Sequence, residues 1–446
     1  MKITVTGQFG NWLFQTASAI KHLGDVKQII SVGCSASEFV NAKNIFGQIC
    51  RISPVKGSCT DMPNAVKWHM KSNWQSLAEI PSREECRKFF NVPKITPETS
   101  PVIHVRGGDY LTYFNKPSEK ITLGHNAIEK IVEKFGCTAG ECIVVTDDVH
   151  YVKSLGLNFK QIRCSTAFND FTYMCNAKRL AISPSTFSWW AGFLGEHEEV
   201  LFPIGTGPWD NGILDKDKHS AHSNLDLCWG EECKPVYIGE ENVFALMCTG
   251  RYKELFPGFY ETFRKYHSEK LYVFTDNEDY FKNYNVETLK INHEQWPGIC
   301  MHKYSNLLKY KHLLCKHKNI VFLQANMRFT RMCNYFDYCG DLMFTYHPYN
   351  ENKKDYICGG LVGGNTYKFF KMAAIVDKWL QENSNAQWHD ETALNWYYNN
   401  FKPACKVLPS WTMAAEERQE LMQNDSSIML LDKTKFFGTC KNNYAR

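Results

Sequence analysis

The sequence predicts an α/β fold with mainly parallel sheets, divided between two domains. Short apolar runs of strand length alternate with helix-like stretches along the chain, a pattern typical of parallel sheets covered by helices. With 446 residues, the chain is longer than one hydrophobic core usually supports. A stretch rich in glycine and polar residues, 203–234, interrupts the alternation. We expect a boundary at its end, near Pro235, and therefore domains 1–234 and 235–446.

The expected strands occur in both domains. In the first domain they are Ile3–Val5, Val102–Val105, Cys142–Thr146, Leu180–Ser183 and Val200–Phe202. In the second they are Phe244–Met247, Leu271–Phe274 and Ile320–Leu323, and a helix-like stretch follows at Thr392–Tyr398. The two halves share no motif, which argues against a duplicated domain.

Composition excludes several classes of protein. The net charge of +4 is far from the basic excess of nucleic-acid-binding proteins. The chain lacks a run of about 18 apolar residues, and its start lacks the apolar core of a signal peptide. We therefore expect a soluble, cytoplasmic protein of microbial or viral type without a membrane anchor. The 18 cysteines are scattered without zinc-ligand spacing, so we expect reduced thiols and no metal.

Polar turns follow the expected strands of the N-terminal half. Gly7–Asn11 resembles a phosphate-binding turn before a helix, but an ordinary tight turn is favoured on this evidence alone. His104 and Arg106 share one face of a strand that ends in Gly107. The guanidinium of Arg106 suits a pyrophosphate, and it suits equally an ion pair with Asp109 that stabilises the turn.

Two further turns complete the set in this half. An acidic pair, Asp147 and Asp148, follows the next strand. Ser185 and Thr186 then begin a helix, where their hydroxyls either contribute to an anion site or simply cap the helix. The adjacent tryptophans 189 and 190 are expected in the domain core and not on a sugar-stacking surface.

Together, these four motifs resemble glycosyltransferase family 11, the α-1,2-fucosyltransferases, over most of residues 1–200. The resemblance implies a GT-B-like pair of Rossmann units and inverting, metal-independent transfer of fucose from GDP-fucose to a galactose 2-hydroxyl. It implies a catalytic site at Arg106, which would hold the pyrophosphate, and Asp109, a candidate general base. The residues that it places at GDP-fucose are Asn11, His104, Arg106, Ser185, Thr186 and Phe187.

The sequence departs from the family pattern at two positions. Gly107 stands where the family has a second arginine, and Trp12 stands where it has glutamine. Losing a charged contact to a phosphate costs on the order of 1.5–3 kcal/mol. Another basic residue therefore compensates, or the fucosyl half is slow, altered in donor choice or inactive.

The C-terminal half also carries polar turns at strand ends, where α/β enzymes bind ligands. Residues 324–326 read Gln-Ala-Asn, where many sugar-nucleotide enzymes carry Asp-x-Asp for a divalent cation. Amides bind such a cation poorly, so we expect metal-free donor binding, unless the segment is only a polar turn. The glycines of Cys358-Gly359-Gly360 allow a ligand to approach the backbone. Asp390 and Glu391 open a helix, as dipole-matched acids or as a catalytic pair.

These motifs, with a His-Pro turn at His347, resemble glycosyltransferase family 6, the blood-group A/B transferases, over about residues 244–412. The resemblance implies one GT-A-like Rossmann unit and retaining transfer. Glu391 would be the nucleophile or would stabilise an oxocarbenium-like ion, and Asp390 would touch the donor sugar. The residues implied at the UDP-sugar are Met247, Cys248, Thr249, Tyr252, Asp276, Lys303, Ala325, Asn326, Cys358, Gly359 and Gly360, with Lys303 at the diphosphate. Those implied at the acceptor are His347, Trp388 and Glu391.

The leading hypothesis is a bifunctional enzyme that uses GDP-fucose and UDP-GalNAc or UDP-Gal on a galactose-terminated oligosaccharide, without a metal or other cofactor. The resemblance to family 6 implies that residues 358 and 360 line the space around the C2 substituent of the donor. Cys358 and Gly360 are small and leave room for an acetamido group, so UDP-GalNAc is the expected donor. One alternative is that the N-terminal half is a noncatalytic glycan- or nucleotide-binding module, which Gly107 favours. Another is a two-domain nucleotide-binding protein without transfer activity.

Overall fold

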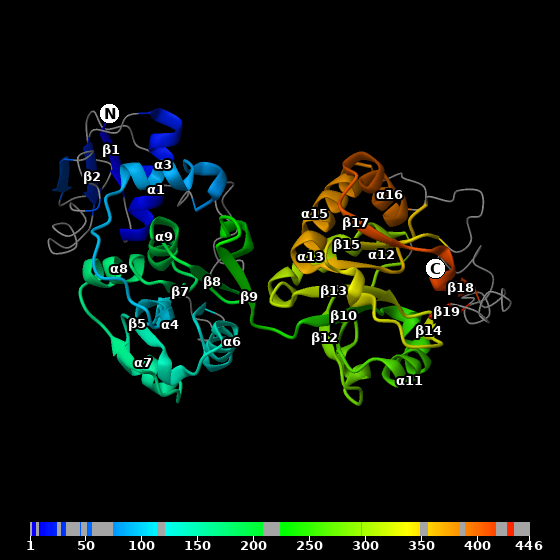
Figure 1. The fold of residues 1–446 in the computed structure, drawn as a ribbon. Coiled ribbons are helices and arrows are strands. Elements are labelled where there is room, and N and C mark those ends of the chain that lie inside the picture. Colours follow the sequence, from blue (N-terminus) through cyan, green and yellow to red (C-terminus); the bar gives the residue numbers. More distant parts are fainter. Residues whose placement is uncertain are drawn as a thin grey trace. The chain divides into compact units, whose positions relative to one another are not determined.

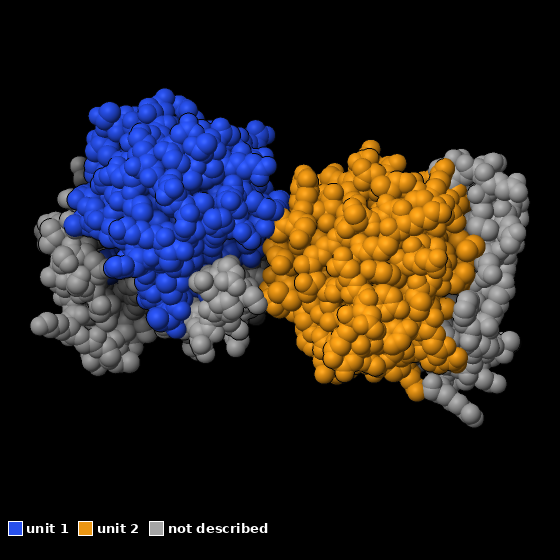
Figure 2. Space-filling view, turned by 90° about the horizontal axis from the view of Figure 1, so that it is seen from below, with its two compact units in different colours: residues 1–238 blue, residues 239–446 orange. Residues whose placement is uncertain are grey.

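The computed structural model describes residues 2–5, 9–24, 28–32, 45, 51–55, 75–113, 121–207, 224–295, 297–347, 356–383, 389–415 and 426–431. The chain forms two compact units, Met1–Ile238 and Gly239–Arg446, which are coloured separately in Figure 2. Strand β9 (Cys233–Tyr237) is paired with β8 (Glu199–Ile204) of the first unit. The boundary expected near Pro235 therefore falls inside this strand.

The larger sheet of the first unit contains six strands in the order β6-β5-β4-β7-β8-β9, and every neighbouring pair is parallel (Figure 1). The order therefore reverses between β4 and β7, and open parallel sheets bind ligands beyond the carboxyl ends of their strands at such a reversal. The four strands not yet given bounds are β4 (Val102–Val105), β5 (Ile143–Thr146), β6 (Gln161–Arg163) and β7 (Arg179–Ala181).

A smaller sheet holds the N-terminal strands. Strands β1 (Lys2–Val5), β2 (Gln28–Val32) and β3 (Arg51–Val55) are parallel and lie in chain order. The helices of the unit are α1 (Phe9–Leu23), α3 (Arg83–Phe89), α4 (Asp109–Tyr113), α6 (His125–Phe135), α7 (Val149–Ser154), α8 (Ala167–Cys175) and α9 (Thr186–Leu194).

Helix α1 packs against α9 through a glycine. A Cβ on Gly10 would lie 2.6 Å from the backbone nitrogen of Phe187 and from Oγ1 of Thr186, so only glycine allows this approach. Residues 9–11 therefore belong to a helix, and the tight turn expected at Gly7–Asn11 is wrong for them. Gly7 and Gln8 lie outside the described residues.

Aromatic side chains fill the core between these helices and the larger sheet. Trp189 and Trp190 are fully buried, as expected, and the ring of Phe14 stacks on Trp189 with a centroid distance of 4.7 Å. Trp12, which stands at the family glutamine position, is also buried in this cluster. Burial of each such side chain contributes about 1.5–3 kcal/mol or more. The core therefore fixes α9, and with it the turn that precedes α9, against the sheet.

The second unit contains a mixed sheet of seven strands in the order β12-β11-β10-β13-β16-β15-β17. Strand β16 is antiparallel to both neighbours and the other pairs are parallel. The order reverses between β10 and β13. The strands are β10 (Asn242–Met247), β11 (Lys270–Thr275), β12 (Glu287–Lys290), β13 (Asn319–Gln324), β15 (Leu342–Thr345), β16 (Val362–Asn365) and β17 (Cys405–Leu408).

A small sheet and several helices complete this unit. Its strands, in the order β14-β19-β18, are β14 (Met327–Phe329), β18 (Met413–Ala415) and β19 (Ile428–Leu430). The helices are α11 (Phe256–Tyr266), α12 (Gly298–Met301), α13 (Lys303–Lys309), α14 (Lys311–Leu314), α15 (Thr366–Glu382) and α16 (His389–Phe401).

Local sequence explains where these helices begin and which face they bury. The side chain of Asn365 caps α15 by accepting the N–H of Lys368, and apolar residues at helical spacing then face the sheet. The expected helix Thr392–Tyr398 lies inside α16. Among the described helices, none has the length and hydropathy required to cross a membrane. The expected α/β fold with parallel sheets is confirmed, as are the eight expected strands.

Candidate functional site

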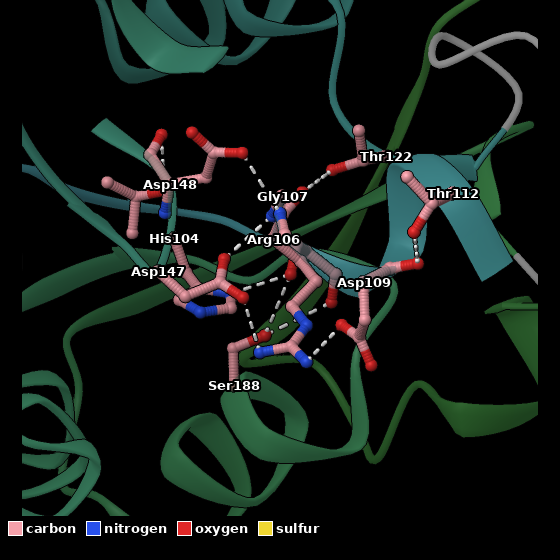
Figure 3. A network of polar contacts seen from close by, with 12 residues as sticks. His104, Arg106, Gly107, Asp109, Thr112, Thr122, Asp147, Asp148 and Ser188 are labelled. Carbon is pink, nitrogen blue, oxygen red and sulfur yellow. Dashed lines mark hydrogen bonds and ion pairs between the residues drawn. The ribbon is translucent and has the colours of Figure 1, made fainter. Parts of the chain in front are cut away.

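Arg106 lies where the strand order of the first unit reverses, directly after β4. Its Nη1 is 2.7 Å from Oδ2 of Asp147, and its Nη2 is 2.5 Å from Oδ1 of Asp109 (Figure 3). The Arg106 side chain is 15% exposed, whereas that of Asp109 is 52% exposed. The ion pair between Arg106 and Asp109, one of the two alternatives that the sequence offered, is therefore present. Asp147, in the turn after β5, adds a second carboxylate to it.

The glycine turn after Arg106 is held by the acidic pair after β5. The N–H of Gly107 donates to Oδ1 of Asp147 at 2.7 Å, and the N–H of Gly108 donates to Oδ2 of Asp148 at 3.2 Å. A Cβ on Gly107 would lie 2.5 Å from Cβ of Asp148. The site therefore has no room for a side chain at position 107, where glycosyltransferase family 11, which this half resembles, carries its second arginine.

His104 is buried beneath this turn and connects β4 to the segment after β7. Its Nδ1 is 2.6 Å from Oγ of Ser183, which lies 3.2 Å from Oγ of Ser188 in α9. Burial, and then the charge of Arg106, lower the pKa of His104 to about 3, so the imidazole is neutral at pH 7. This neutral ring aligns the strand end with the start of α9.

The start of α9 brings the remaining residues of this half together. Ser185 occupies the N-cap position, but its side chain does not cap the helix and instead hydrogen-bonds with Tyr110. The Phe187 ring lies 5.7 Å from that of His104. Asn11, whose Oδ1 accepts from Gln75 at 3.1 Å, follows the glycine that contacts Thr186. All six residues implied at GDP-fucose thus lie on segments in contact with this strand-order reversal.

In the second unit, one polar cluster follows β10 and β11. The N–H of Gly250 donates to Oδ1 of Asp276 at 3.1 Å, and Nζ of Lys253 lies 3.1 Å from Oδ2. Partial burial alone would raise the pKa of Asp276, but the bonds from Lys253 and Gly250 outweigh it and lower the pKa. Oγ1 of Thr249 lies 3.3 Å from Nδ1 of His293. The sequence did not single out Lys253 or His293, because neither belongs to a motif.

Other residues expected at the UDP-sugar differ in how deeply their side chains are buried. The side chains of Cys248 and Ala325 are fully buried in the apolar core and offer only backbone atoms to a ligand. Asn326 is buried as well, and its Nδ2 donates to the carbonyl of Leu431 at 3.4 Å. Met247 and Tyr252 are half-buried at the end of β10 and after it.

Lys303 is buried at the start of α13. Its Nζ donates to the carbonyl of Gly359 at 2.6 Å and lies 3.0 Å from Oδ2 of Asp390. Burial opposes the lysine charge, but the carboxylate of Asp390 outweighs burial and raises the pKa of Lys303. The ammonium that the resemblance placed at the donor diphosphate is therefore engaged with Asp390 and the glycine loop.

The carboxylate of Glu391 is fixed from both sides. Its Oε1 accepts the N–H of Gly359 at 2.9 Å, and its Oε2 lies 3.7 Å from Nε2 of His347. Burial, and then the negative charge of Asp390, raise the pKa of Glu391. A Cβ on Gly359 would lie 3.0 Å from Cγ of Glu391, so glycine keeps the loop close to this side chain. Trp388 lies outside the described residues.

The neighbouring glycine faces the end of β13. A Cβ on Gly360 would lie 3.1 Å from the carboxamide of Gln324 and 3.3 Å from Cε of Met327. A side chain larger than glycine at 360 would thus press on the Gln-Ala-Asn segment, which stands where many sugar-nucleotide enzymes carry Asp-x-Asp.

Asn395 is a residue that the sequence did not reveal. Its Oδ1 accepts the N–H of Ile357 at 2.8 Å, and its Nδ2 donates to the carbonyl of the same residue at 2.9 Å. Its Nδ2 also reaches the carbonyl of Glu391 at 2.8 Å. Asn395 therefore joins α16 to the segment that precedes the glycine loop. Its position one helical turn after Glu391 was the available signal.

Comparison with known proteins agrees with the geometry of the first unit. Residues 76–211 match the sequence model of Glycosyl transferase family 11, a range that includes Arg106 and the start of α9. The chain is also similar to the O-antigen biosynthesis glycosyltransferase WbnI of Escherichia coli, with 28% identity over 236 residues that cover 45% of this chain and 98% of the relative. Residues 76–211 are thus similar to glycosyl transferase family 11, and both similarities point to a glycosyltransferase.

Proposed function

We propose that the chain is a bifunctional glycosyltransferase, built from a GT-B-like and a GT-A-like half. Residues 1–238 transfer fucose from GDP-fucose, with inversion, to the 2-hydroxyl of a terminal galactose. Residues 239–446 transfer GalNAc or Gal from the UDP-sugar, with retention, to the 3-hydroxyl of the same galactose. The product is a blood-group A/B-like glycan. The family 11 match over residues 76–211 is the observation that carries the first activity.

The surroundings of Arg106 support the first reaction. A pyrophosphate at the reversal of strand order would replace the exposed carboxylate of Asp109 at the guanidinium, which already has the geometry for a pair of acceptors. Asp109, once displaced from the guanidinium, would accept the proton of the attacking hydroxyl. Arg106 would thus neutralise the leaving nucleotide without a metal ion.

The fixed carboxylate of Glu391 supports the second reaction. A retaining transfer needs a carboxylate beside the anomeric carbon, either to attack it or to stabilise its positive charge. One oxygen of Glu391 is held by the Gly359 N–H, and the other, 3.7 Å from Nε2 of His347, would face the sugar. Asp390 would be a second acidic side chain at the donor, and the positive charge of Lys303 balances its negative charge.

A second candidate function for the first unit follows from the same residues. The guanidinium of Arg106 is occupied by two carboxylates, and Gly107 supplies no second positive charge. These features favour a module that binds a nucleotide or glycan without transferring sugar. In that case, only the second unit is a transferase.

Product analysis by mass spectrometry tests both activities in the full chain. The acceptor is lactose, and the donors are GDP-fucose, UDP-GalNAc and UDP-Gal, first alone and then in pairs. Arg106→Ala should remove fucosylated product only, and Glu391→Gln should remove the UDP-sugar product only, when a fucosylated acceptor is supplied. Arg179→Ala is the matched control, because Arg179 also pairs with a carboxylate, Glu199, but at the amino ends of β7 and β8, whereas Arg106 follows the carboxyl end of β4.

The outcomes separate the alternatives. If GDP-fucose binds to the unmodified chain but fucosylated lactose never forms, the first unit is a binding module. If Arg106→Ala binds GDP-fucose with unchanged affinity, the pyrophosphate assignment is wrong. If Glu391→Gln retains near-normal transfer from the UDP-sugar, the carboxylate has no part in that chemistry.

A further inference from the structure

Three side chains with different metal-binding atoms converge beside the glycine loop of the second unit. They are His347, which follows β15, Cys358 in the loop, and Glu391 in the first turn of α16. The imidazole nitrogen, the thiol sulfur and a carboxylate oxygen all lie within 4.8 Å of one another. Within the described ranges, this is the one such group of three His, Cys, Asp or Glu residues. Its members come from three separate segments, and their spacing in the sequence matches no zinc motif.

The spacing is close to that of a tetrahedral zinc site. Zinc bonds of about 2.0–2.3 Å place neighbouring donor atoms about 3.5 Å apart. Nε2 of His347 and Oε2 of Glu391 are already separated by 3.7 Å. A shift of Cys358 Sγ of roughly 1 Å, within reach of a side-chain rotation, closes the set.

The surroundings orient these donors. The N–H of Gly360 lies 3.3 Å from the sulfur of Cys358, to which it donates, and the N–H of Gly359 occupies Oε1 of Glu391. Oε2 is thereby turned toward the imidazole. Such outer hydrogen bonds are typical of metal sites, where they fix the direction of each ligand. The side chains of His347 and Glu391 are 23% and 18% exposed, so an ion can reach them from solvent.

We propose that His347, Cys358 and Glu391 bind a zinc ion that inhibits the second unit by occupying its active site. A thiolate and an imidazole beside a single carboxylate favour zinc, because magnesium and manganese prefer oxygen ligands. On binding, the Cys358 thiol releases its proton to solvent and a zinc–sulfur bond forms. One imidazole nitrogen and one carboxylate oxygen complete three protein ligands, and water takes the fourth position. The ion is here an inhibitor and not a cofactor.

Inhibition rests on the proposed role of Glu391, whereas binding does not. A zinc ion on Oε2 occupies the oxygen that would face the anomeric carbon, and it cancels the negative charge that would stabilise the transition state. Micromolar zinc should therefore reduce transfer from the UDP-sugar, and a chelator should restore it. Fucosyl transfer by the first unit, which contains none of the three ligands, is the internal control.

Cobalt titration of the full chain tests the site without any assay of activity. Co²⁺ should give a thiolate-to-metal charge-transfer band in the near ultraviolet that saturates at one ion per chain and disappears on addition of Zn²⁺. Cys358→Ser should abolish this band, whereas Cys339→Ser, a change at another buried thiol of the same unit, should leave it. To measure zinc inhibition, the rate of each variant without zinc is compared with the rate of the same variant with zinc. The ratio of rates without and with zinc should fall at least tenfold in Cys358→Ser and in His347→Gln.

Each result has one meaning. Absence of the cobalt band, or its persistence in Cys358→Ser, overturns the site whatever the enzyme does. A band with the expected variant behaviour but no UDP-sugar transfer in any condition supports the metal site and contradicts the proposed function. If Cys358→Ser does not fold, zinc X-ray absorption on the unmodified chain decides. One sulfur at about 2.3 Å with nitrogen and oxygen at about 2.0 Å supports the site, and a shell without sulfur refutes it.

Discussion

Nζ of Lys303 lies 3.0 Å from Oδ2 of Asp390, and both side chains are buried. Removing one partner of a buried ion pair leaves an uncompensated charge, which costs about 3–5 kcal/mol. We predict that Lys303→Met lowers the free energy of unfolding of the second unit by an amount in this range, measured by urea denaturation.

The control for this change is Lys309→Met, on the exposed side of the same helix, with an expected effect within about 0.5 kcal/mol. The double variant Lys303→Met with Asp390→Asn should recover part of the loss, because no charge remains buried alone. If Lys303→Met is as stable as the unmodified chain but binds the UDP-sugar poorly, the lysine serves the diphosphate instead.

The raised pKa of Glu391 predicts how transfer from the UDP-sugar depends on pH. The carboxylate form is the active one, so the rate falls as pH falls through the pKa of Glu391 in the folded enzyme. Because burial and Asp390 raise that pKa, the acid limb of kcat/KM should lie above the ordinary glutamate value of about 4.3. An acid limb at or below the ordinary value would contradict the assignment. Glu382→Gln, at an exposed position of α15, is the control that should keep the profile unchanged.

Transfer by the second unit should persist in excess EDTA. Gln324, Ala325 and Asn326 offer no carboxylate pair for a divalent cation at the end of β13. The measurement is the initial rate with UDP-GalNAc before and after chelation and dialysis. Complete loss of transfer that manganese restores would show that a catalytic cation binds elsewhere. A rate that rises with EDTA would instead agree with removal of bound zinc.

Gly360→Ala should shift donor preference from UDP-GalNAc toward UDP-Gal. The added methyl group would lie 3.1 Å from the Gln324 carboxamide, so it fills space near the expected donor position. Selection by bulk alone is worth about 1–3 kcal/mol, or roughly 10–200-fold in the ratio of the two products. Competition between equal concentrations of both donors measures that ratio. Gly340→Ala, where an added Cβ meets no atom within 4 Å, should leave it unchanged. A majority of galactosylated product from the unmodified chain would refute the GalNAc assignment.

Gly107→Ala should destabilise the first unit by about 1–3 kcal/mol, the usual cost of overpacking. The added methyl group would lie 2.5 Å from Cβ of Asp148 and would push apart the turns after β4 and β5. Thermal unfolding of the full chain measures the effect. Gly140→Ala, where the nearest atom is 3.8 Å away, should change stability by less than about 0.5 kcal/mol. Equal melting temperatures for the two variants would mean that the turn adapts to a side chain.

The sequence predicted the sheets well because strand patterns are local. All eight expected strands are present, and the motifs at their ends meet where the strand orders reverse. The burial of Trp189 and Trp190 also followed from their surroundings in sequence. Parallel sheets place the carboxyl ends of their strands along one edge, so motifs far apart in the chain could be expected to lie together.

Contacts between distant segments were harder to predict. The sequence placed Lys303 at a diphosphate, but it did not reveal that Lys303 pairs with Asp390, 87 residues later. Asn395 bonds to the backbone of Ile357, which no motif marks. Gly10 was interpreted as part of a turn, because its contact with α9 depends on packing between two helices that are far apart in the sequence. Each of these roles is defined by a partner that local patterns do not specify.

The contact between Gly10 and Thr186 also limits how the first unit can move. At Gly10 the backbone of α1 comes so close to the start of α9 that the contact leaves no space for a side chain at this position. Separating α1 from α9 would open a void in the aromatic core that surrounds Phe14 and Trp189. A movement of α1 that preserves this contact would therefore turn about Gly10. Closure over a nucleotide would then change the tilt of α1 and leave its distance from α9 unchanged.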